Sequence, residues 1–294
     1  MSQRRNYIEL HFIVALWGAT AILGLLIQVP APEVVFLRTA VASLALWIIL
    51  KLKKINYAIG RDQAVRILLT GGLFAIHWVL FFESARQANA SVSLVGLSTC
   101  ALWTALFEPI ANRKKIKGFE VFLGLLIIVG LYVIFSFEFQ YPLGLAMSVV
   151  AGIIAAVFTI INSRFAQKHS SYTITFYEMV GAAIVSAAII PFYLYIGEME
   201  AFVWPTIPDW GYLLILSIVC TVFAYTISVR LIKELTPYAF NLVVNMEPIY
   251  GMLLALVIFG DSEKMNNNFY YGSAIIISAI FIYPVRNRWK RRVR

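Results

Sequence analysis

The residues of this sequence that could do chemistry are single ionisable and amide side chains inside long apolar runs. Glu247, followed directly by Pro248, lies about eleven residues into its run, so at 1.5 Å per residue it sits roughly 16 Å deep. An ionisable group in the middle of a membrane helix costs about 2.5–3.5 kcal/mol, which makes it a candidate for function. A carboxyl at this depth could bind a solute or carry a proton, or it could be a structural group beside a proline kink.

Two amide side chains precede this carboxyl on the same run. On a regular helix Asn241 and Asn245 form one polar stripe, whereas Glu247 points about 200° away from Asn245. The three could share one cavity only if Pro248 relaxes the helix. For Asn245, hydrogen bonding to a solute and hydrogen bonding between helices both remain open.

A histidine among aromatic residues forms the second candidate group. His77 lies about thirteen residues into its run, Trp78 follows it, and Phe81 shares its helix face. This spacing predicts an aromatic cavity wall with one titratable group, and the alternative is a packing histidine. Further residues expected near the same depth, either as ligands or as packing groups, are Trp17, Trp103, Ser98, Thr99 and Tyr225.

Several kinds of site are missing from the sequence. There is no Walker A run, which excludes ATP-driven transport by this chain, and no HExxH, CxxC or GxSxG arrangement that would indicate a membrane-embedded enzyme. Cys100 and Cys220 each lie alone in an apolar run and are expected to be free and buried. The sequence therefore predicts no enzyme, no metal site and no cofactor.

Composition identifies the elements that must position these residues. The chain has 294 residues, of which 61% are hydrophobic and 13% charged. Soluble proteins average about 45–50% apolar and about 25% charged residues. The apolar runs of roughly 17–25 residues can each cross a hydrocarbon layer of about 30 Å as a helix, so we expect an all-α polytopic membrane protein. The ten predicted transmembrane helices are 7–27, 33–50, 64–83, 90–108, 119–136, 142–162, 172–196, 209–229, 236–259 and 268–285.

The basic residues predict the orientation of the chain. If both termini are cytoplasmic, 21 of the 24 Lys and Arg residues fall in inner segments, Arg86 and Lys264 fall in outer loops, and Arg38 lies within a span. This bias follows the positive-inside rule for a multi-pass protein of a bacterial-type plasma membrane. The basic tail at 286–294 is accordingly an orientation signal, and the net charge of +9 does not indicate nucleic-acid binding.

Weak internal similarity divides the chain into two halves, 7–136 and 142–285. Residues 98–101 align with 245–248, and residues 36–38 align with 176–178. Because each half has five spans, the second must be inverted relative to the first. Arg38 and Glu178 are then equivalent but lie near opposite faces, with gating or helix-anchoring roles expected and outward snorkelling of Arg38 as the alternative. Ala101 stands where the second half has Pro248, so the two half-helices are expected to match imperfectly.

This layout resembles the EamA-type members of the drug/metabolite transporter superfamily. The resemblance covers roughly residues 7–285, and it identifies the family better than the substrate. It implies a central cavity among spans 1, 3, 4, 6, 8 and 9, export from the cytoplasm, and a monomer or a homodimer. The residues that carry it are Trp17-Gly18, Arg38, 245–249, 253–256, Gly260-Asp261 and 271–276.

Together these features predict a secondary transporter that works by alternating access. Its expected substrate is a small amphipathic metabolite, such as an amino acid or a related compound, and exchange for protons would depend on Glu247 and His77. The alternatives are a passive facilitator of the same solutes and a membrane-embedded lipid-handling protein. The second alternative would need a polar cluster at one interface, whereas the polar residues here are scattered near mid-depth.

Overall fold

A computed structural model describes residues 3–88, 90–135, 141–259 and 267–292. Gly260, Asp261 and Lys264, on which some of the sequence predictions rest, lie outside these ranges. In the described ranges every regular element is helical. Six spans are single helices: α3 (Ala31–Leu52), α4 (Arg61–Gln87), α7 (Gly118–Phe135), α8 (Pro142–Phe165), α9 (Ser171–Tyr195) and α14 (Asn267–Arg292).

The other four spans are composite. They are α1 (Gln3–Gly18) with α2 (Thr20–Leu26), α5 (Ala90–Leu97) with α6 (Cys100–Ala111), α10 (Ile207–Leu214) with the π-helix η1 (Ile215–Phe223) and α11 (Ala224–Glu234), and α12 (Pro237–Val244) with α13 (Glu247–Phe259). Over the described residues, seven spans meet length and hydropathy criteria for crossing a membrane, and Gly118–Ile134 and Tyr270–Arg286 are shorter apolar helices. The predicted fold class, all-α with ten spans, is confirmed.

Local sequence signals explain where the helices begin. Pro32 lies in the first turn of α3, where its missing N–H costs no hydrogen bond. The Ser170 side chain caps α9 by accepting a hydrogen bond from the Thr173 N–H. Thr206 and Asp209 form a reciprocal capping box at the start of α10.

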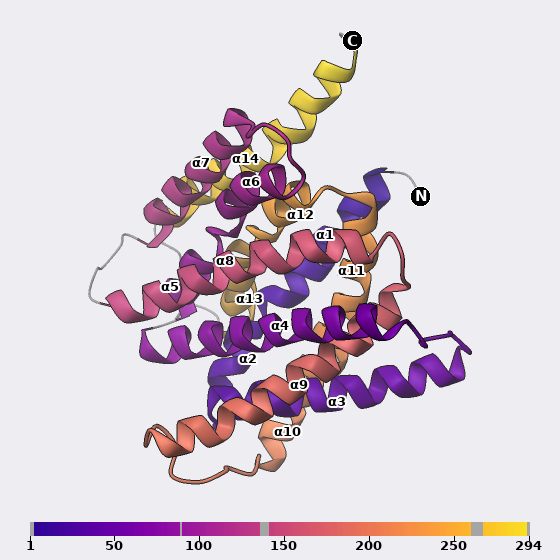
Figure 1. Cartoon of the computed structure of the whole chain (residues 1–294). Helices are drawn as coiled ribbons and strands as arrows, with labels where there is room; N and C mark the ends of the chain where they lie inside the picture. Colours follow the sequence, from indigo (N-terminus) through magenta and orange to yellow (C-terminus); the bar gives the residue numbers. More distant parts are fainter. Residues whose placement is uncertain (1–2, 89, 136–140, 260–266, 293–294) are drawn as a thin grey trace.

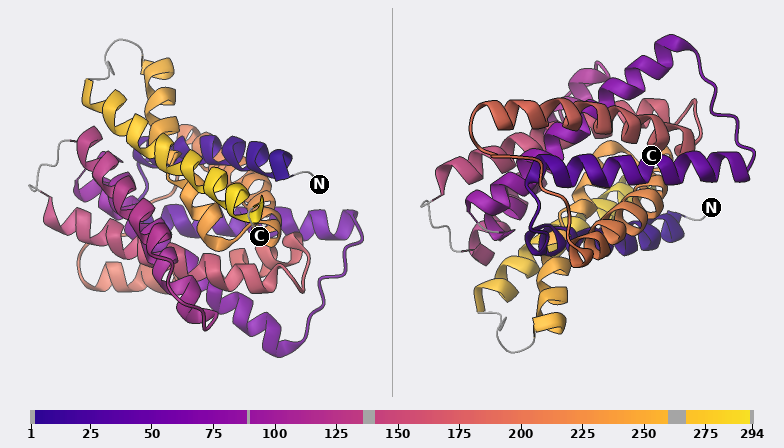
Figure 2. Two further views of the ribbon diagram at one scale, coloured as in Figure 1. Left: turned by 90° about the horizontal axis from the view of Figure 1, so that it is seen from above. Right: turned by 90° about the horizontal axis from the view of Figure 1, so that it is seen from below.

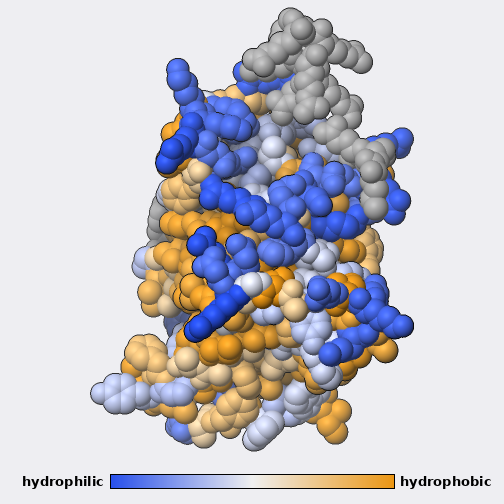
Figure 3. Space-filling model, turned by 45° about the vertical axis from the view of Figure 1, so that its right-hand side comes forward, coloured by the Kyte–Doolittle hydropathy of each residue, from blue (hydrophilic) through white to orange (hydrophobic). Residues whose placement is uncertain are grey.

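The spans run side by side, with both ends of the described chain on one side of the molecule (Figures 1 and 2). We call this side, which also carries loops 53–60, 112–117 and 166–170, the terminal side, and the side with loops 27–30 and 196–206 the distal side. Figure 3 shows hydrophilic side chains gathered on the face turned toward the terminal side and apolar side chains covering the neighbouring flank. This distribution fits a protein that exposes apolar helices to lipid.

Packing joins the two halves along the length of the bundle. Helix α9 packs against α3 and α4, α4 packs against α8, and α7 packs against α14. Figure 1 shows the α3–α9 pair and the α7–α14 pair on opposite flanks, with α1, α4 and α8 among the helices drawn between them. Helices α3 and α9 are the second and seventh spans, and α7 and α14 are the fifth and tenth. Each pair therefore joins two spans that are equivalent in the five-span repeat, so the two halves meet in equivalent ways at both flanks.

The crossing of α4 and α9 depends on two glycines. A Cβ atom added at Gly71 would lie 2.1 Å from the Glu178 carbonyl oxygen, and one added at Gly181 would lie 2.1 Å from the Leu68 carbonyl oxygen. Real Cβ atoms do not approach backbone oxygens so closely, so only glycine permits this backbone separation. The contact fixes the position of Glu178 on the inner face of α9.

Both halves contain an interrupted helix at the same place. The breaks fall at Ser98–Thr99 and at Asn245–Met246. In each break the N–H of the first residue donates to the carbonyl four residues before it. The N–H of the second residue donates to the carbonyl only three residues before it. The prediction that the two interrupted helices match imperfectly, because the first half lacks the proline, is wrong. The hydroxyls of Ser98 and Thr99 donate to carbonyls of their own preceding turn, an interaction that bends helices without proline.

Candidate solute-binding cavity

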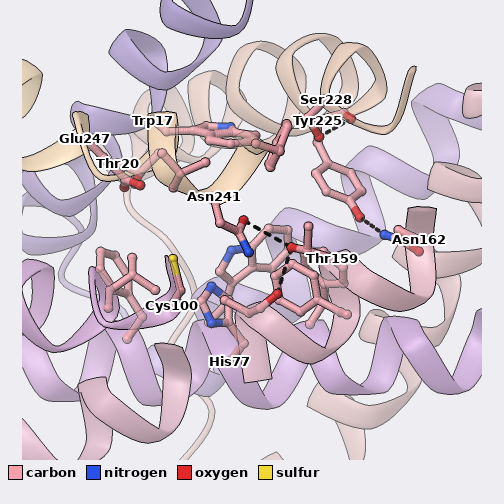
Figure 4. Close-up of a pocket in the computed structure, with 18 of the residues that line it drawn as sticks. Trp17, Thr20, His77, Cys100, Thr159, Asn162, Tyr225, Ser228, Asn241 and Glu247 are labelled. Carbon is pink, nitrogen blue, oxygen red and sulfur yellow. Dashed lines mark hydrogen bonds between the residues drawn. The ribbon is translucent and has the colours of Figure 1, made fainter. Parts of the chain in front are cut away.

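A cavity of about 90 Å³ lies at the centre of the bundle, between spans of both halves (Figure 4). Spans 1, 3, 4, 6, 8 and 9 contribute to its wall, and span 2 adds Arg38. Its aromatic lining consists of Trp17, Phe74, Trp78, Phe81, Phe158, Tyr225 and Phe240. Its polar or charged lining includes Thr20, Arg38, His77, Thr159, Asn162, Ser228, Asn241 and Glu247.

Arg38 is buried on the cavity wall. Its side chain is 2% exposed, so the alternative in which it snorkels outward is wrong. The Nε–H donates to the Thr221 hydroxyl at 2.8 Å, and the guanidinium carbon lies 4.0 Å from the centre of the Trp78 ring. One hydrogen bond and one cation–π contact hold the group in place and leave its terminal nitrogens for other partners.

Glu247 reaches the cavity because the ninth span is broken. It is the first residue of α13, directly after the break, and both it and Asn241 line the cavity. On a regular helix Asn241, Asn245 and Glu247 could not all face one cavity, and the structure agrees, because Asn245 does not line it. Asn245, in the break itself, points instead toward the first half, where its Oδ1 accepts a 3.9 Å hydrogen bond from the Cys100 thiol.

The two buried charges of the cavity wall are not paired directly. No ion pair within 4 Å joins Arg38 and Glu247, although the guanidinium acts electrostatically on the carboxylate. A charge buried without a direct partner is costly unless something polar offsets it. The wall therefore offers a cation and a carboxylate that a bound solute can approach separately.

His77 and Trp17 are held by backbone carbonyls of other spans. The Nδ1–H of His77 donates to the Ala151 carbonyl at 2.9 Å, which leaves Nε2 as the free ring nitrogen. The Nε1–H of Trp17 donates to the Cys220 carbonyl at 3.0 Å. Both bonds orient rings at the cavity wall, so these residues are positioned by the fold and still exposed to a solute.

A hydrogen-bonded chain leads from the cavity to Glu178. The Asn162 amide donates to the Tyr225 hydroxyl at 2.7 Å, and that hydroxyl donates to the Glu178 carboxylate at 2.9 Å. Asn162 and Tyr225 line the cavity, whereas Glu178 lies behind them and is fully buried. Figure 4 places Tyr225 and Asn162 toward one end of the cavity and Glu247 and Thr20 toward the other.

Some predicted site residues lie away from this cavity. Trp103 donates to the Thr99 hydroxyl and stacks on Phe107, so the ring packs along α6. Ser98 and Asn245 face each other across the two helix breaks, in a small gap next to Glu247. These residues shape the breaks and do not contact the main cavity.

Other lining residues were not singled out from the sequence. Phe74 and Phe158 stack with ring centres 3.7 Å apart, and Thr159 and Asn162 project from α8. A signal for Asn162 was available, because an amide near the end of the otherwise apolar run 142–162 is unusual. Nothing in the sequence distinguished Phe74 from the other phenylalanines. Cys100 and Cys220 are free and buried, as expected, and both lie on the wall.

The chemistry available in the cavity is that of binding. Over the part of the chain that the structure describes, no cluster of three His, Cys, Asp or Glu side chains could hold a metal ion. Aromatic rings supply apolar contact, and a few fixed donors, acceptors and charges supply orientation, which is the usual composition of a small-molecule site.

Comparison with known proteins places this architecture among transporters. A model of the EamA-like transporter family matches residues 8–136 and again residues 142–283. An uncharacterized transporter of Archaeoglobus fulgidus is 26% identical over 208 residues, which are 68% of this chain and 69% of the relative. The pseudopaline exporter CntI of Pseudomonas aeruginosa is 23% identical over 195 residues, which are 65% of this chain and 64% of the exporter. The match with that exporter thus spans slightly less than two thirds of its length.

One solved crystal structure has the same fold. It aligns with a TM-score of 0.76, covering 95% of this chain and 96% of the other, at 17% sequence identity. At this level of identity the similarity concerns the fold alone.

Proposed function

The chain belongs to the EamA-like transporter family, and from its central cavity we propose that it exports small amphipathic metabolites, amino acids or related compounds, by alternating access in exchange for protons. The resemblance to this family in the sequence is confirmed by the two matches across the chain. Its function is transport across a membrane and not catalysis.

The observation that carries the proposed substrate class is the composition of the cavity wall. Stacked and edge-packed rings cover most of it, while Arg38 and Glu247 supply opposite charges without pairing directly. An apolar body fits such rings, and charge-assisted hydrogen bonds to the two charged groups would fix a carboxyl and an amino group. This arrangement supports a small solute that has apolar surface and both kinds of polar group.

The size of the cavity supports alternating access. About 90 Å³ is small beside the roughly 300–1,000 Å³ of typical ligand pockets, so a solute can enter only after the wall moves. The residues that flank the matching breaks line this cavity, Leu97 and Cys100 in the fourth span and Val244 and Glu247 in the ninth, so the breaks are suitable hinges.

The distribution of charge and of lining residues supports the direction of transport. Arg113, Lys114, Lys115 and Lys117 all lie in or next to the loop at 112–117 on the terminal side, so we assign that side, both termini and the basic tail 286–294 to the cytoplasm of a plasma membrane. The cavity lining extends toward this side as far as Ile232, two residues before the end of α11. A relative named as an exporter agrees with outward transport.

Transport by purified protein in liposomes tests the proposal. The vesicles are loaded with labelled amino acids, nucleosides and amphipathic cations, and efflux is followed with and without a pH gradient. We expect the gradient to accelerate efflux of amino acids or closely related solutes. Efflux of the same solutes that ignores the gradient would instead identify a passive facilitator. Efflux of none of them by folded protein would contradict the proposed substrate class.

A further inference from the structure

Glu178 is a fully buried carboxyl that is only partly satisfied. One oxygen accepts the hydrogen bond from Tyr225, while Oε1 has no hydrogen-bond partner among the described residues. Two nearby oxygens are also buried without a hydrogen-bond partner among the described residues, Oδ1 of Asn162 and the hydroxyl of Thr175. Thr175 lies three residues before Glu178, on the same face of α9. Asn162 is linked to the Glu178 carboxyl through the Tyr225 hydroxyl, to which both are hydrogen-bonded. Buried oxygens without hydrogen-bond partners around one carboxyl indicate that a donor belongs there, which can be a proton, a cation or an ordered water.

The groups that face this carboxyl do not neutralise it. Helix α11 brings Tyr225, which donates to the carboxylate, and α8 brings Asn162, which donates to the same Tyr225 hydroxyl. Gly71 of α4 packs against the backbone of Glu178. Arg38 of α3 is held by Thr221 and Trp78 instead. The ion pairs found among the described residues involve other acids, namely Glu9, Asp62 and Glu120.

An isolated ionised carboxylate in such a place is costly, so Glu178 needs a proton or another cation. A proton on Oε1 would make this oxygen a hydrogen-bond donor, and the nearby oxygens of Asn162 and Thr175 could then accept from it. A hard cation such as calcium takes about six to eight oxygen ligands. The three unsatisfied oxygens here are fewer, which favours the proton.

We propose that Glu178 is the proton-binding carboxyl of the transport cycle and that Tyr225 and Asn162 connect it to the solute in the cavity. This inference rests on the proposed function, which it extends by assigning the site of coupling. The Tyr225 hydroxyl touches both the cavity and Glu178, so a solute amino group arriving at Tyr225 and Asn162 brings positive charge toward the carboxyl. That charge favours the ionised form, so solute and proton exclude each other as antiport requires.

Glu247 has a different position in this arrangement. It faces the cavity directly and is accompanied by Arg38, whose positive charge offsets its own. Glu247 is thus suited to contact the solute, while Glu178, lying behind Tyr225, is shielded from it. The two glutamates can be separated experimentally for this reason.

Two transport assays on the full chain in liposomes test the coupling. Solute exchange at equal concentrations needs no driving force, whereas accumulation against a solute gradient needs the pH gradient. We expect the rate of solute exchange by Glu178→Gln to stay within about twofold of the wild-type rate. The accumulation driven by the pH gradient should fall about tenfold or more. Glu33→Gln is the matched control, since Glu33 is also fully buried but lies at the distal end of α3, and it should change neither assay. Equal loss of both activities in folded Glu178→Gln, or accumulation driven by sodium, would overturn the proposal.

An infrared measurement tests the proton directly and needs no solute. The carbonyl stretch of a protonated carboxyl should be present in the wild type, disappear in Glu178→Gln, and shift in Tyr225→Phe because that variant loses the hydrogen bond to the carboxyl. If no carboxyl band of the wild type is lost in Glu178→Gln, or if the band that is lost does not respond to Tyr225→Phe, the assignment is overturned. If the wild type moves no solute, the proposed function fails while this measurement still decides whether Glu178 binds a proton.

Discussion

Arg38 and Glu178 occupy equivalent positions in the two halves, and each contacts an aromatic residue that is equivalent by the same repeat. Arg38 lies over the ring of Trp78, and Glu178 accepts the hydroxyl of Tyr225. Trp78 and Tyr225 are 147 residues apart, the same interval that separates the two helix breaks. Each charge lies seven residues from the start of its helix, at about 10 Å depth from opposite sides. The repeat has thus placed a cation on the cavity wall and an acid directly behind that wall.

Removing the charge of Arg38 should change which solutes are recognised. We expect Arg38→Gln to lower the affinity for solutes that bear a carboxylate by about tenfold to a hundredfold, since hydrogen bonds to charged groups contribute about 1.5–3 kcal/mol. Solutes without a carboxylate should be little affected. Competition for exchange in liposomes measures both. Arg66→Gln, which alters an exposed pair with Asp62, is the control. If solutes with and without a carboxylate lose affinity equally, the role of Arg38 is to stabilise the fold through its hydrogen bond to Thr221.

Trp78 should determine solute preference more than folding. Its ring lies on the cavity wall and packs against Phe74, so Trp78→Ala removes apolar contact area from the site. We expect solutes with larger apolar parts to lose the most affinity, with expression nearly unchanged. Exchange rates for a homologous series of solutes, compared with the yield of monodisperse protein, separate the two effects. A fall in yield without a change in preference would show that Trp78 is a packing residue.

The glycine contact between α4 and α9 should be sensitive to a single methyl group. In Gly71→Ala the added Cβ would meet the Glu178 carbonyl oxygen, and overpacking of this kind costs about 1–3 kcal/mol. We expect a lower melting temperature in detergent. Gly211→Ala is the control, because a Cβ there meets nothing within 4 Å and alanine favours the helix by up to about 1 kcal/mol. Similar melting temperatures for both variants would contradict the close packing.

The proposed orientation can be checked with introduced cysteines. In a background of Cys100→Ala and Cys220→Ala, Lys114→Cys should react with a membrane-impermeant maleimide only after cells are permeabilised. Glu198→Cys, in the loop 196–206 on the distal side, should react on intact cells. The opposite labelling pattern would place the termini outside and reverse the assigned direction of transport.

The sequence alone determined the class, the ten spans and much of the site. Apolar runs long enough to cross a bilayer can form only helices there, because unpaired backbone groups are too costly in lipid. The high cost of intramembrane charge likewise made Arg38 and Glu247 visible as single residues, and both line the cavity. The family resemblance followed from the same landmarks and was confirmed by comparison.

Only the tertiary structure decided which polar residues share the cavity. Helical periodicity predicted that Asn241, Asn245 and Glu247 could not share one cavity on a regular helix. In the structure Asn241 and Glu247 line the cavity, while Asn245 lies in the break between α12 and α13. The matching break in the first half formed through side-chain hydroxyls and not through a proline. The chain from Asn162 through Tyr225 to Glu178 joins three helices, so no local pattern could predict it. Hydrogen bonds between distant segments depend on how helices pack, and packing is not encoded within one apolar run.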